Sequence, residues 1–553
     1  MPKLICLIFC LAVVYPVLGE ANEIGSDFDA PILSIGSNAN EIFLSDDKGF
    51  GTRAIALWNV VPFQNIKKEI EIGVVAFHMN GIERIDFSAN GGPITSVKIA
   101  KINKRTNVLE YSIRLQIENN QDQKVDLRAI AYPNMGEPRE LKPLILYANG
   151  HGRYSGKTVF VTNKRQKSKG VGTKSKPFSS MSKALRKAGS GGRVILLDPG
   201  LYYLGGKAGI KNIKSWITIE GREGLDKNDI ILGLKERKLV RLDVDKLKFK
   251  NLSLDVGSFI QIYPEITTFV WFDKVVWFDS KGWAGVHKGQ KLNPVRTSKY
   301  IGGYFVTNSI SKDSLYGYPD AKLVRNSHLE RISGDALQGV QMVLNVTIDN
   351  MDGDVRDHHS DILQYFGDFD NVIVFGLRAT NIRNVQNIFL GHYKSSFQNM
   401  AFVNIAIDNK KGNPPFSQLS SQQDHVLFYH LSIPNQDWIV RDDMPNEKQF
   451  KAKNVIIKNS ILGSLKRGKH SWRGLPSGML ISNTHFVRGA MHGKFPTSGK
   501  LNFSELSSNK ITYDRIRPSV VVGNASPIFI YRNENPPPKR NIFINKGAFL
   551  FKP

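Results

Sequence analysis

The stretch NVIVFGLRATNIRNVQNIFLGHYKSSFQNMAFVNIAID (residues 371–408) contains two strand-like apolar pieces, NVIVFGLRAT (371–380) and NMAFVNIAID (399–408). Similar pieces occur before and after it, at MVLNVTIDNM (342–351), HVLFYHLSI (425–433) and NVIIKNSIL (454–462). Their starts lie about 24 to 30 residues apart, which is the length of one supersecondary unit in a solenoid. The spacing predicts an all-β coil in which each strand lies parallel on the previous one.

The same pattern extends in weaker form from about Thr158 to about Ser508. A β-propeller is the alternative fold, but it needs about four strands per blade and a blade signature, and neither is present. Asparagine recurs just before or inside several strands. We interpret these asparagines as stacked structural residues without a catalytic role: Asn345, Asn371, Asn399, Asn454 and Asn483.

Two different segments precede the repeats. Residues 20–152 alternate apolar and polar positions between turn signals such as Asn80-Gly81, which predicts a β-sandwich of immunoglobulin or fibronectin type. Residues 178–188 then predict a short amphipathic helix between two strands. This layout resembles the opening segment of right-handed parallel β-helices, where a helix covers the apolar end of the coil. We therefore expect a right-handed parallel β-helix over residues 153–510 and a C-terminal extension over residues 511–553.

The first 19 residues have the composition of a secretory signal peptide. A short basic start precedes the apolar stretch LICLIFCLAVVYPVL (residues 4–18), and small-residue cleavage chemistry follows at Gly19. Both cysteines, Cys6 and Cys10, fall in this segment, so the mature chain is expected to contain none. We predict a secreted or periplasmic protein of bacterial origin that does not insert into a membrane.

The net charge of +26 falls by only one unit when the predicted signal peptide is removed. An exported protein this basic is expected to meet a polyanion, and an acidic polysaccharide is the substrate class that we predict. No nucleic-acid-binding motif is present, so nucleic acid is not an expected partner. We expect a monomer.

Acidic and amide side chains recur at one spacing near the middle of the coil. Asp335 and Asp361 are 26 residues apart, as are Asp361 and Asn387, and Gln338 and Gln364 follow the two aspartates by three residues. One coil per 26 residues would stack Asp335, Asp361 and Asn387, with the two carboxylates roughly 5 Å apart. A stacked structural ladder is the alternative interpretation of this spacing.

Further polar residues crowd the same region, which favours a functional site. Six of them lie within eight residues, namely Asp354, Arg356, Asp357, His358, His359 and Asp361. Others occur one coil away, namely Glu330, Arg331, His392, Tyr393 and Lys394.

The segment HSDILQ (residues 359–364) resembles the H-x-D-x-x-Q segment of many secreted proteins of the pectate-lyase-like superfamily of right-handed β-helices. GDAL (334–337) partly resembles the GDD segment of polygalacturonases, with Ala336 in place of the second aspartate. DHHSD (357–361) partly resembles the DPHD segment of alginate epimerases, without the proline. The resemblance implies the β-helix fold and activity on carbohydrates.

Two reactions fit these residues. In β-elimination, Arg356 would neutralise a uronate carboxylate, and His358, His359 or Lys394 would remove the C5 proton. In hydrolysis, Asp335 and Asp361 would act as the acid and base pair. A Ca²⁺ ion is the one cofactor considered, with Asp335, Asp361 and Asp354 as its ligands. The remaining candidates would bind substrate, namely Arg331, Gln364, His392 and Tyr393.

A polysaccharide lyase is the predicted activity. A glycoside hydrolase, a C5-epimerase and a non-catalytic polysaccharide-binding β-helix are the alternatives. Aromatic side chains that could stack on sugars would favour the binding protein, although core packing is the expected role of most of them. These residues are Tyr263, Trp271, Trp277, Trp283, Tyr304 and Tyr393.

Overall fold

The structure is a computed structural model, and it describes most of the chain from Gly51 to Phe486. The described residues are 51–103, 106, 108–116, 122–165, 169–204, 208–233, 244–255, 268–278, 301–353, 360–391, 395–409, 416–441, 450–467, 478–482, 484–486, 517–521 and 527–530. In this part of the chain, no helix is long and apolar enough to cross a membrane.

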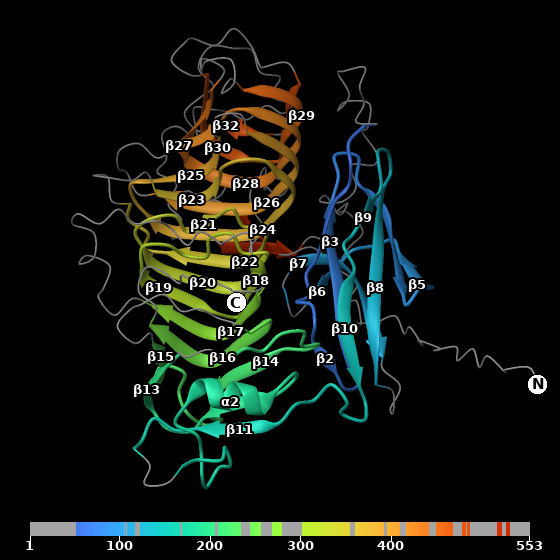
Figure 1. The fold of residues 1–553 in the computed structure, drawn as a ribbon. Helices are drawn as coiled ribbons and strands as arrows, with labels where there is room; N and C mark the ends of the chain where they lie inside the picture. The colour runs from blue at the N-terminus through green and yellow to red at the C-terminus, as the bar shows by residue number, and fades with distance from the viewer. Residues whose placement is uncertain are drawn as a thin grey trace, which may run out of the picture.

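Two sheets form the first structural unit, as the sequence pattern predicted (Figure 1). One has the order β1-β3-β7-β6, with strands Ile55–Trp58, Glu69–Phe77, Val108–Gln116 and Lys101–Asn103. The other has the order β2-β10-β8-β4-β5, with strands Asn65–Ile66, Leu144–Asn149, Asp122–Pro133, Ile82–Ala89 and Gly92–Val97, and with β9 (Arg139–Glu140) beside β8. Alternating residues of these strands are buried, so the two sheets form a β-sandwich.

The second unit is a right-handed parallel β-helix, in which the described residues form 22 strands, β11 to β32 (Figure 1). Its first strands are β11 Thr158–Val161, β12 Arg193–Leu196, β13 Gly200–Tyr203, β14 Ile217–Gly221, β15 Ile230–Gly233, β16 Lys246–Asp255, β17 Thr268–Phe278, β18 Ile301–Thr307, β19 Ile310–Ser314, β20 Leu323–Ile332 and β21 Leu337–Gln338. The others are β22 Met342–Asp349, β23 Ser360–Tyr365, β24 Phe369–Ile382, β25 Val385–Leu390, β26 Ser396–Asn409, β27 Phe416–Leu419, β28 Gln422–Val440, β29 Lys451–Lys458, β30 Ile461–Arg467, β31 Met479–Ser482 and β32 His485–Phe486.

The strand pairings form three parallel sheets along the coil. Sheet A contains β11, β12, β14, β18, β29, β31 and the first parts of the long strands. Sheet B contains β13, β15, β19 and the later parts of the same long strands. Sheet C contains β21, β23, β25, β27 and the ends of β28 and β30.

A row of left-handed residues bends each long strand from sheet A into sheet B. Asparagine adopts positive φ more readily than most residues, which explains its recurrence in the sequence. The Nδ2 of Asn345 donates to the Oδ1 of Asn326 on the preceding coil at 3.0 Å. The structural role predicted for the asparagines is therefore confirmed at Asn345, and Asn483 lies outside the described residues. The row consists of Asn251, Lys274, Asn308, Asn326, Asn345, Gly376, Asn404, His430 and Asn459.

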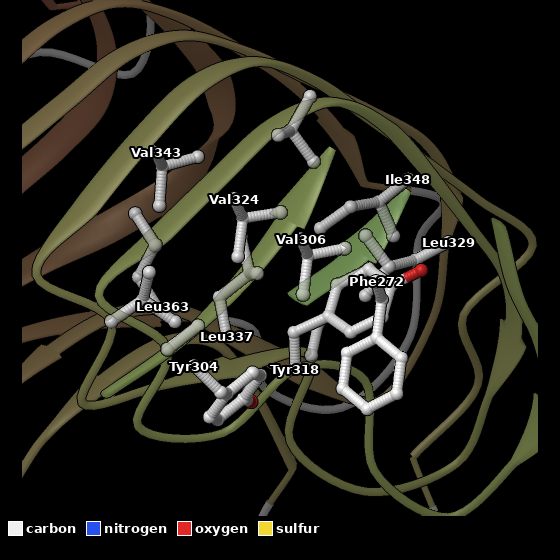
Figure 2. Close-up of a cluster of buried hydrophobic side chains, with 14 of the residues drawn as sticks. Phe272, Tyr304, Val306, Tyr318, Val324, Leu329, Leu337, Val343, Ile348 and Leu363 are labelled. Carbon is white, nitrogen blue, oxygen red and sulfur yellow. The ribbon is translucent and has the colours of Figure 1, made fainter. Parts of the chain in front are cut away.

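The inside of the coil is filled by apolar side chains from all three sheets (Figure 2). Rings repeat from coil to coil because residues in register lie one strand spacing apart. Phe402 and Phe428 stack with centroids 5.1 Å apart, and Phe249 and Phe272 do so at 5.4 Å. Such a core needs no disulfide, because every coil buries its apolar face against two neighbours.

Helix α2 (Met181–Ala188) covers the amino-terminal end of the coil, as predicted from residues 178–188. The side chain of Ser180 accepts a hydrogen bond from the Lys183 N–H and caps the helix. Met181 and Leu185 are buried on the face toward the coil. At the other end of the chain, β33 (Arg517–Val521) and β34 (Pro527–Ile530) form a separate antiparallel pair.

The β-sandwich packs against the outer face of sheet A, an arrangement that the sequence did not reveal (Figure 1). Asn371 makes two hydrogen bonds of 2.9 Å to the main chain of Ala56. Arg139 forms a two-bond ion pair with Asp370, with both distances 3.1 Å. The apolar cluster of the sandwich also continues into Trp216 of the β-helix. Sheet A is thus covered, and among the three sheets the candidate residues concentrate on sheet C.

Candidate functional site

Asp335 and Asp361 lie directly above one another, as their spacing predicted. The N–H of Asp361 donates to Oδ1 of Asp335 at 3.0 Å. The N–H of Ala336 donates to the carbonyl of Asp361 at 2.9 Å. These two bonds fix the aspartates on adjacent coils at the edge where sheet C begins.

A second pair of polar side chains lies beside the aspartates. Gln338 pairs with Gln364 in sheet C, and its Nε2 donates to the Gln364 Oε1 at 2.6 Å. The Nε2 of Gln364 in turn donates to Oδ2 of Asp361. Asp361 and Gln364 therefore share one face of β23, although strict alternation would put residues three apart on opposite faces. Ile362 and Leu363, between them, belong to the buried core.

Asn387 does not join this stack, and that prediction is wrong. Asp361 pairs with Gln386, so this coil advances by 25 residues instead of 26. Asn387 consequently lies in register with Ile362 and is fully buried. The physical reason is that only the strands must stay in register, whereas the connecting segments of successive coils differ in length.

The aspartate pair is almost completely buried, and Asp335 is the more exposed of the two. Asp361 is 0% exposed, Gln364 is 2% exposed and Asp335 is 8% exposed. Near this pair, burial raises the pKa of Tyr316 to about 12, and the negative charge of Asp335 acts in the same direction. Asp335 is the better placed of the two carboxylates to meet a ligand, and Asp361 is placed to hold Asp335 and Gln364.

Arg331 belongs to a different cluster, near the end of strand β20 and four residues before Asp335. Its guanidinium forms ion pairs with Asp313, at 2.8 Å from Nη2 to Oδ2, and with Glu330. The hydrogen bonds that Arg331 donates to the Asp313 carboxylate raise the pKa of Arg331 and favour its charged form. A substrate carboxylate would have to compete with these two acids, so the predicted binding role of Arg331 stays a prediction.

Seven candidates lie outside the described residues. They are Asp354, Arg356, His358 and His359 in the first segment and His392, Tyr393 and Lys394 in the second, and Asp357 also falls in the first. β23 begins at Ser360, directly after the first segment, whereas β25 ends at Leu390, just before the second. Because the strands are parallel, these attachment points are at opposite edges of sheet C, about 17 Å apart.

The described residues do not by themselves form a calcium site. Among them, no group of three or more acidic, histidine or cysteine side chains gathers as for a metal ion. Ca²⁺ takes six to eight oxygen ligands, whereas one oxygen of Asp335 and one of Asp361 already accept N–H bonds. Asp354, the third predicted ligand, lies outside the described residues.

An aromatic pair beside the glutamines was missed in the sequence. Phe389 follows Gln364 in register and is itself followed by Gln418. Its ring centroid lies 5.3 Å from that of Phe366, which is 37% exposed. A 25-residue register would have revealed Phe389, but the 26-residue register directed attention to Asn387.

The aromatic residues that were considered as sugar platforms are mostly internal. Trp271, Trp277 and Tyr304 are between 6% and 7% exposed. Trp271 faces the β-sandwich, and the other two belong to the core of the coil. Tyr263, Trp283 and Tyr393 lie outside the described residues. Core packing is therefore the role of the three that can be examined.

Comparison with known proteins gives few matches. No protein-family model matches the chain, and no curated protein matches it. Among solved structures, the chain is similar to Dex49A from Penicillium minioluteum, with 11% sequence identity, 80% of each chain covered and a TM-score of 0.22. A TM-score that low carries no argument about the reaction or the substrate.

Proposed function

We propose that this protein is an exported enzyme that degrades an acidic polysaccharide, by β-elimination, at the outer face of sheet C. The observation that carries the proposal is the hydrogen-bonded cluster of Asp335, Asp361, Gln338 and Gln364 on two adjacent coils of sheet C. Burying two carboxylates on adjacent coils costs more free energy than burying apolar side chains there, even when the carboxylates accept hydrogen bonds, which favours a use beyond folding.

Charge supports the choice of substrate. The chain carries a net charge of +26, and electrostatic attraction raises the local concentration of a polymer of opposite sign. The segments on either side of the cluster in the sequence add His358, His359, Arg356 and Lys394. The predicted signal peptide would deliver the protein to the space where such polymers occur.

In the proposed elimination, each of these groups has a separate chemical role. A cation such as Arg356 neutralises the uronate carboxylate, which acidifies the proton at C5. His358, His359 or Lys394 takes that proton, the electron pair forms the C4–C5 double bond, and the C4–O4 bond breaks. The released oxygen takes a proton from an acid or from water. Asp361, through its bonds to Asp335 and Gln364, acts as a positioning residue.

Hydrolysis is the second candidate, and the aspartate pair favours it. Adjacent coils are about 4.8 Å apart, close to the roughly 5 to 5.5 Å between the carboxyl groups of retaining glycosidases. One aspartate would attack the anomeric carbon while the other protonated the leaving oxygen. The burial of Asp361 opposes this role, because a nucleophile must touch the sugar.

The products decide between these reactions. The purified protein is incubated separately with polygalacturonate, alginate and chondroitin sulfate, and ultraviolet absorbance and reducing ends are followed together. Elimination produces both signals, hydrolysis produces reducing ends alone, and epimerisation changes the uronate spectrum by NMR without shortening the chain. Binding without any of these changes would show a non-catalytic protein and refute the proposal.

A further inference from the structure

The amino-terminal end of the β-helix is strongly basic. We define the basic cap as residues 153–165, 169–204 and 208–214, which include β11, α2, β12 and β13 (Figure 1). The cap has a single acidic residue, Asp198, and its described part has thirteen lysines and arginines, all of them exposed. They are Arg153, Lys157, Lys164, Arg165, Lys169, Lys174, Lys176, Lys183, Arg186, Lys187, Arg193, Lys211 and Lys214.

These cations are attached to an ordered framework. The N–H of Phe160 in β11 donates to the carbonyl of Gly172, and the N–H groups of Val171 and Gly172 both donate to the carbonyl of Lys176. These bonds hold the loop that carries several of the lysines against the first strand. Lys183 projects from α2, whose opposite face is buried. The backbone that carries these charges is therefore held in place, which reduces the backbone entropy lost when a ligand binds.

Internal ion pairs neutralise little of this charge. Within the described residues, Lys164 pairs with Asp198 at 2.8 Å, and Arg193 pairs with Glu220 just beyond the cap. With one carboxylate in the whole segment, the cap retains a large positive excess. Like charges at this density repel one another, so an anionic ligand would relieve an existing cost.

Exposed apolar side chains occur on the same end of the coil. On β13, Tyr203 is 51% exposed and Leu201 is 43% exposed, and they lie on the same side of the strand. A phenol ring can pack against the apolar face of a sugar while its hydroxyl stays in water. Cations beside an exposed aromatic ring suit a polymer that carries both acid groups and ring surfaces.

We propose that the basic cap is a second, non-catalytic binding surface for an anionic polysaccharide. The cap is separate from the sheet C cluster. Strand β22 belongs to the same coil as β23, which carries Asp361, and six successive strand pairings along sheet A connect β12 of the cap to β22. At about 4.8 Å per step, the two sites are about 30 Å apart along the coil. One polymer chain could occupy both, and the cap would hold it during repeated reaction.

Nucleic acid is the other polyanion that such a surface could attract. The predicted export of the protein and the absence of a nucleic-acid-binding motif favour polysaccharide. The test must still include nucleic acid, because the electrostatic part of binding is common to both polymers.

The test compares two charge-matched variants of the full chain. The cap variant carries Lys169→Ser, Lys174→Ser, Lys176→Ser and Lys183→Ser, and the control carries Lys67→Ser, Lys68→Ser, Lys98→Ser and Lys101→Ser in the β-sandwich. All eight lysines are exposed, so both variants should fold, which circular dichroism would check. Binding to polygalacturonate, alginate, chondroitin sulfate, neutral dextran and single-stranded DNA is measured by affinity electrophoresis at several salt concentrations.

We expect the cap variant to lose about tenfold or more in affinity for the acidic polysaccharides at low salt, while the control stays within about twofold. The slope of log affinity against log salt should fall by up to about 3 in the cap variant, since up to four ionic contacts are lost. Equal losses in both variants, no binding to any acidic polysaccharide, or cap-dependent binding that is tighter to DNA would overturn the proposal. Binding is measured directly, so it is independent of the reaction at sheet C.

Discussion

Two buried histidines join the β-sandwich to the β-helix and should make the fold sensitive to acid. The rings of His78 and His425 lie 4.6 Å apart. The Asn80 N–H donates to Nδ1 of His78 at 3.1 Å, and the Met79 N–H donates to Nε2 of His425 at 3.2 Å. Each ring thus uses one nitrogen as an acceptor, which requires the neutral form.

The other nitrogen of each ring carries the proton and also has a partner. Nε2 of His78 lies 2.7 Å from the Thr52 hydroxyl, and Nδ1 of His425 lies 3.0 Å from Oδ1 of Asn399. Burial lowers the pKa of His78 from 6.5 to about 4. Burial also lowers the pKa of His425, and the nearby His78 and Arg139 act in the same direction.

The sign and size of the effect follow from these pKa values. Between pH 6.5 and about pH 4, His78 is protonated in the unfolded chain but stays neutral in the folded chain. The free energy of unfolding therefore decreases as the pH is lowered through this range. The difference between the two pKa values of His78, 6.5 unfolded and about 4 folded, corresponds to about 3 kcal/mol of unfolding free energy. About 2 kcal/mol of this stability is lost between pH 7 and pH 5. His425 adds a loss of the same sign.

Urea unfolding followed by tryptophan fluorescence tests this, because Trp216 and Trp271 lie at the same interface. The loss of unfolding free energy between pH 7 and pH 5 should be about 2 kcal/mol smaller in His78→Asn than in the wild type. His328→Asn, on sheet B beside Thr347, is the control and should keep the full loss. An unchanged pH dependence in His78→Asn would refute the assignment of a neutral, buried imidazole.

Three other changes test the packing, the bend and the candidate site. Phe402→Ala removes a ring stacked on Phe428 in the core and should lower the free energy of unfolding by about 3 to 5 kcal/mol in urea unfolding. Asn345→Ala should lower the free energy of unfolding by about 1 to 2 kcal/mol more than Asn345→Gly, because the φ angle of residue 345 is 50° and alanine adopts a positive φ less readily than glycine. Equal stabilities of the two variants would contradict the left-handed bend. Phe366→Ala should raise KM for the acidic polymer with little change in kcat if Phe366 and Phe389 form a sugar platform; a loss confined to kcat would place them elsewhere in the mechanism.

The β-helix was predictable because its sequence pattern involves residues close together in the chain and repeats from coil to coil. Apolar residues recur at fixed positions and asparagine recurs at most of the bends, so MVLNVTIDNM and NVIVFGLRAT could be recognised as equivalent. The same rule correctly placed Asp335 beside Asp361. It failed for Asn387, because one coil is a residue shorter and nothing in the sequence requires equal loops.

The packing of the β-sandwich was not predictable in this way. Phe375 packs against Phe77, which lies almost 300 positions earlier in the chain, and the pattern of a single sequence gives no information about such distant pairs. The accessibility of the site was hidden for the same reason. Spacing places Asp361 on a strand, but whether its carboxylate reaches solvent depends on what covers the strand.

The central claim, that the Asp335–Asp361 pair serves degradation of an acidic polysaccharide, is tested most directly by initial rates of depolymerisation in wild type, Asp361→Asn and Asp349→Asn. Asp349 is a matched control, since it bonds to Thr380 and Asn381 on the next coil but lies on sheet B. We predict that Asp361→Asn abolishes turnover with an unchanged circular dichroism spectrum, while Asp349→Asn retains it. Turnover that survives in Asp361→Asn would show that the carboxylate pair is structural and contradict the claim.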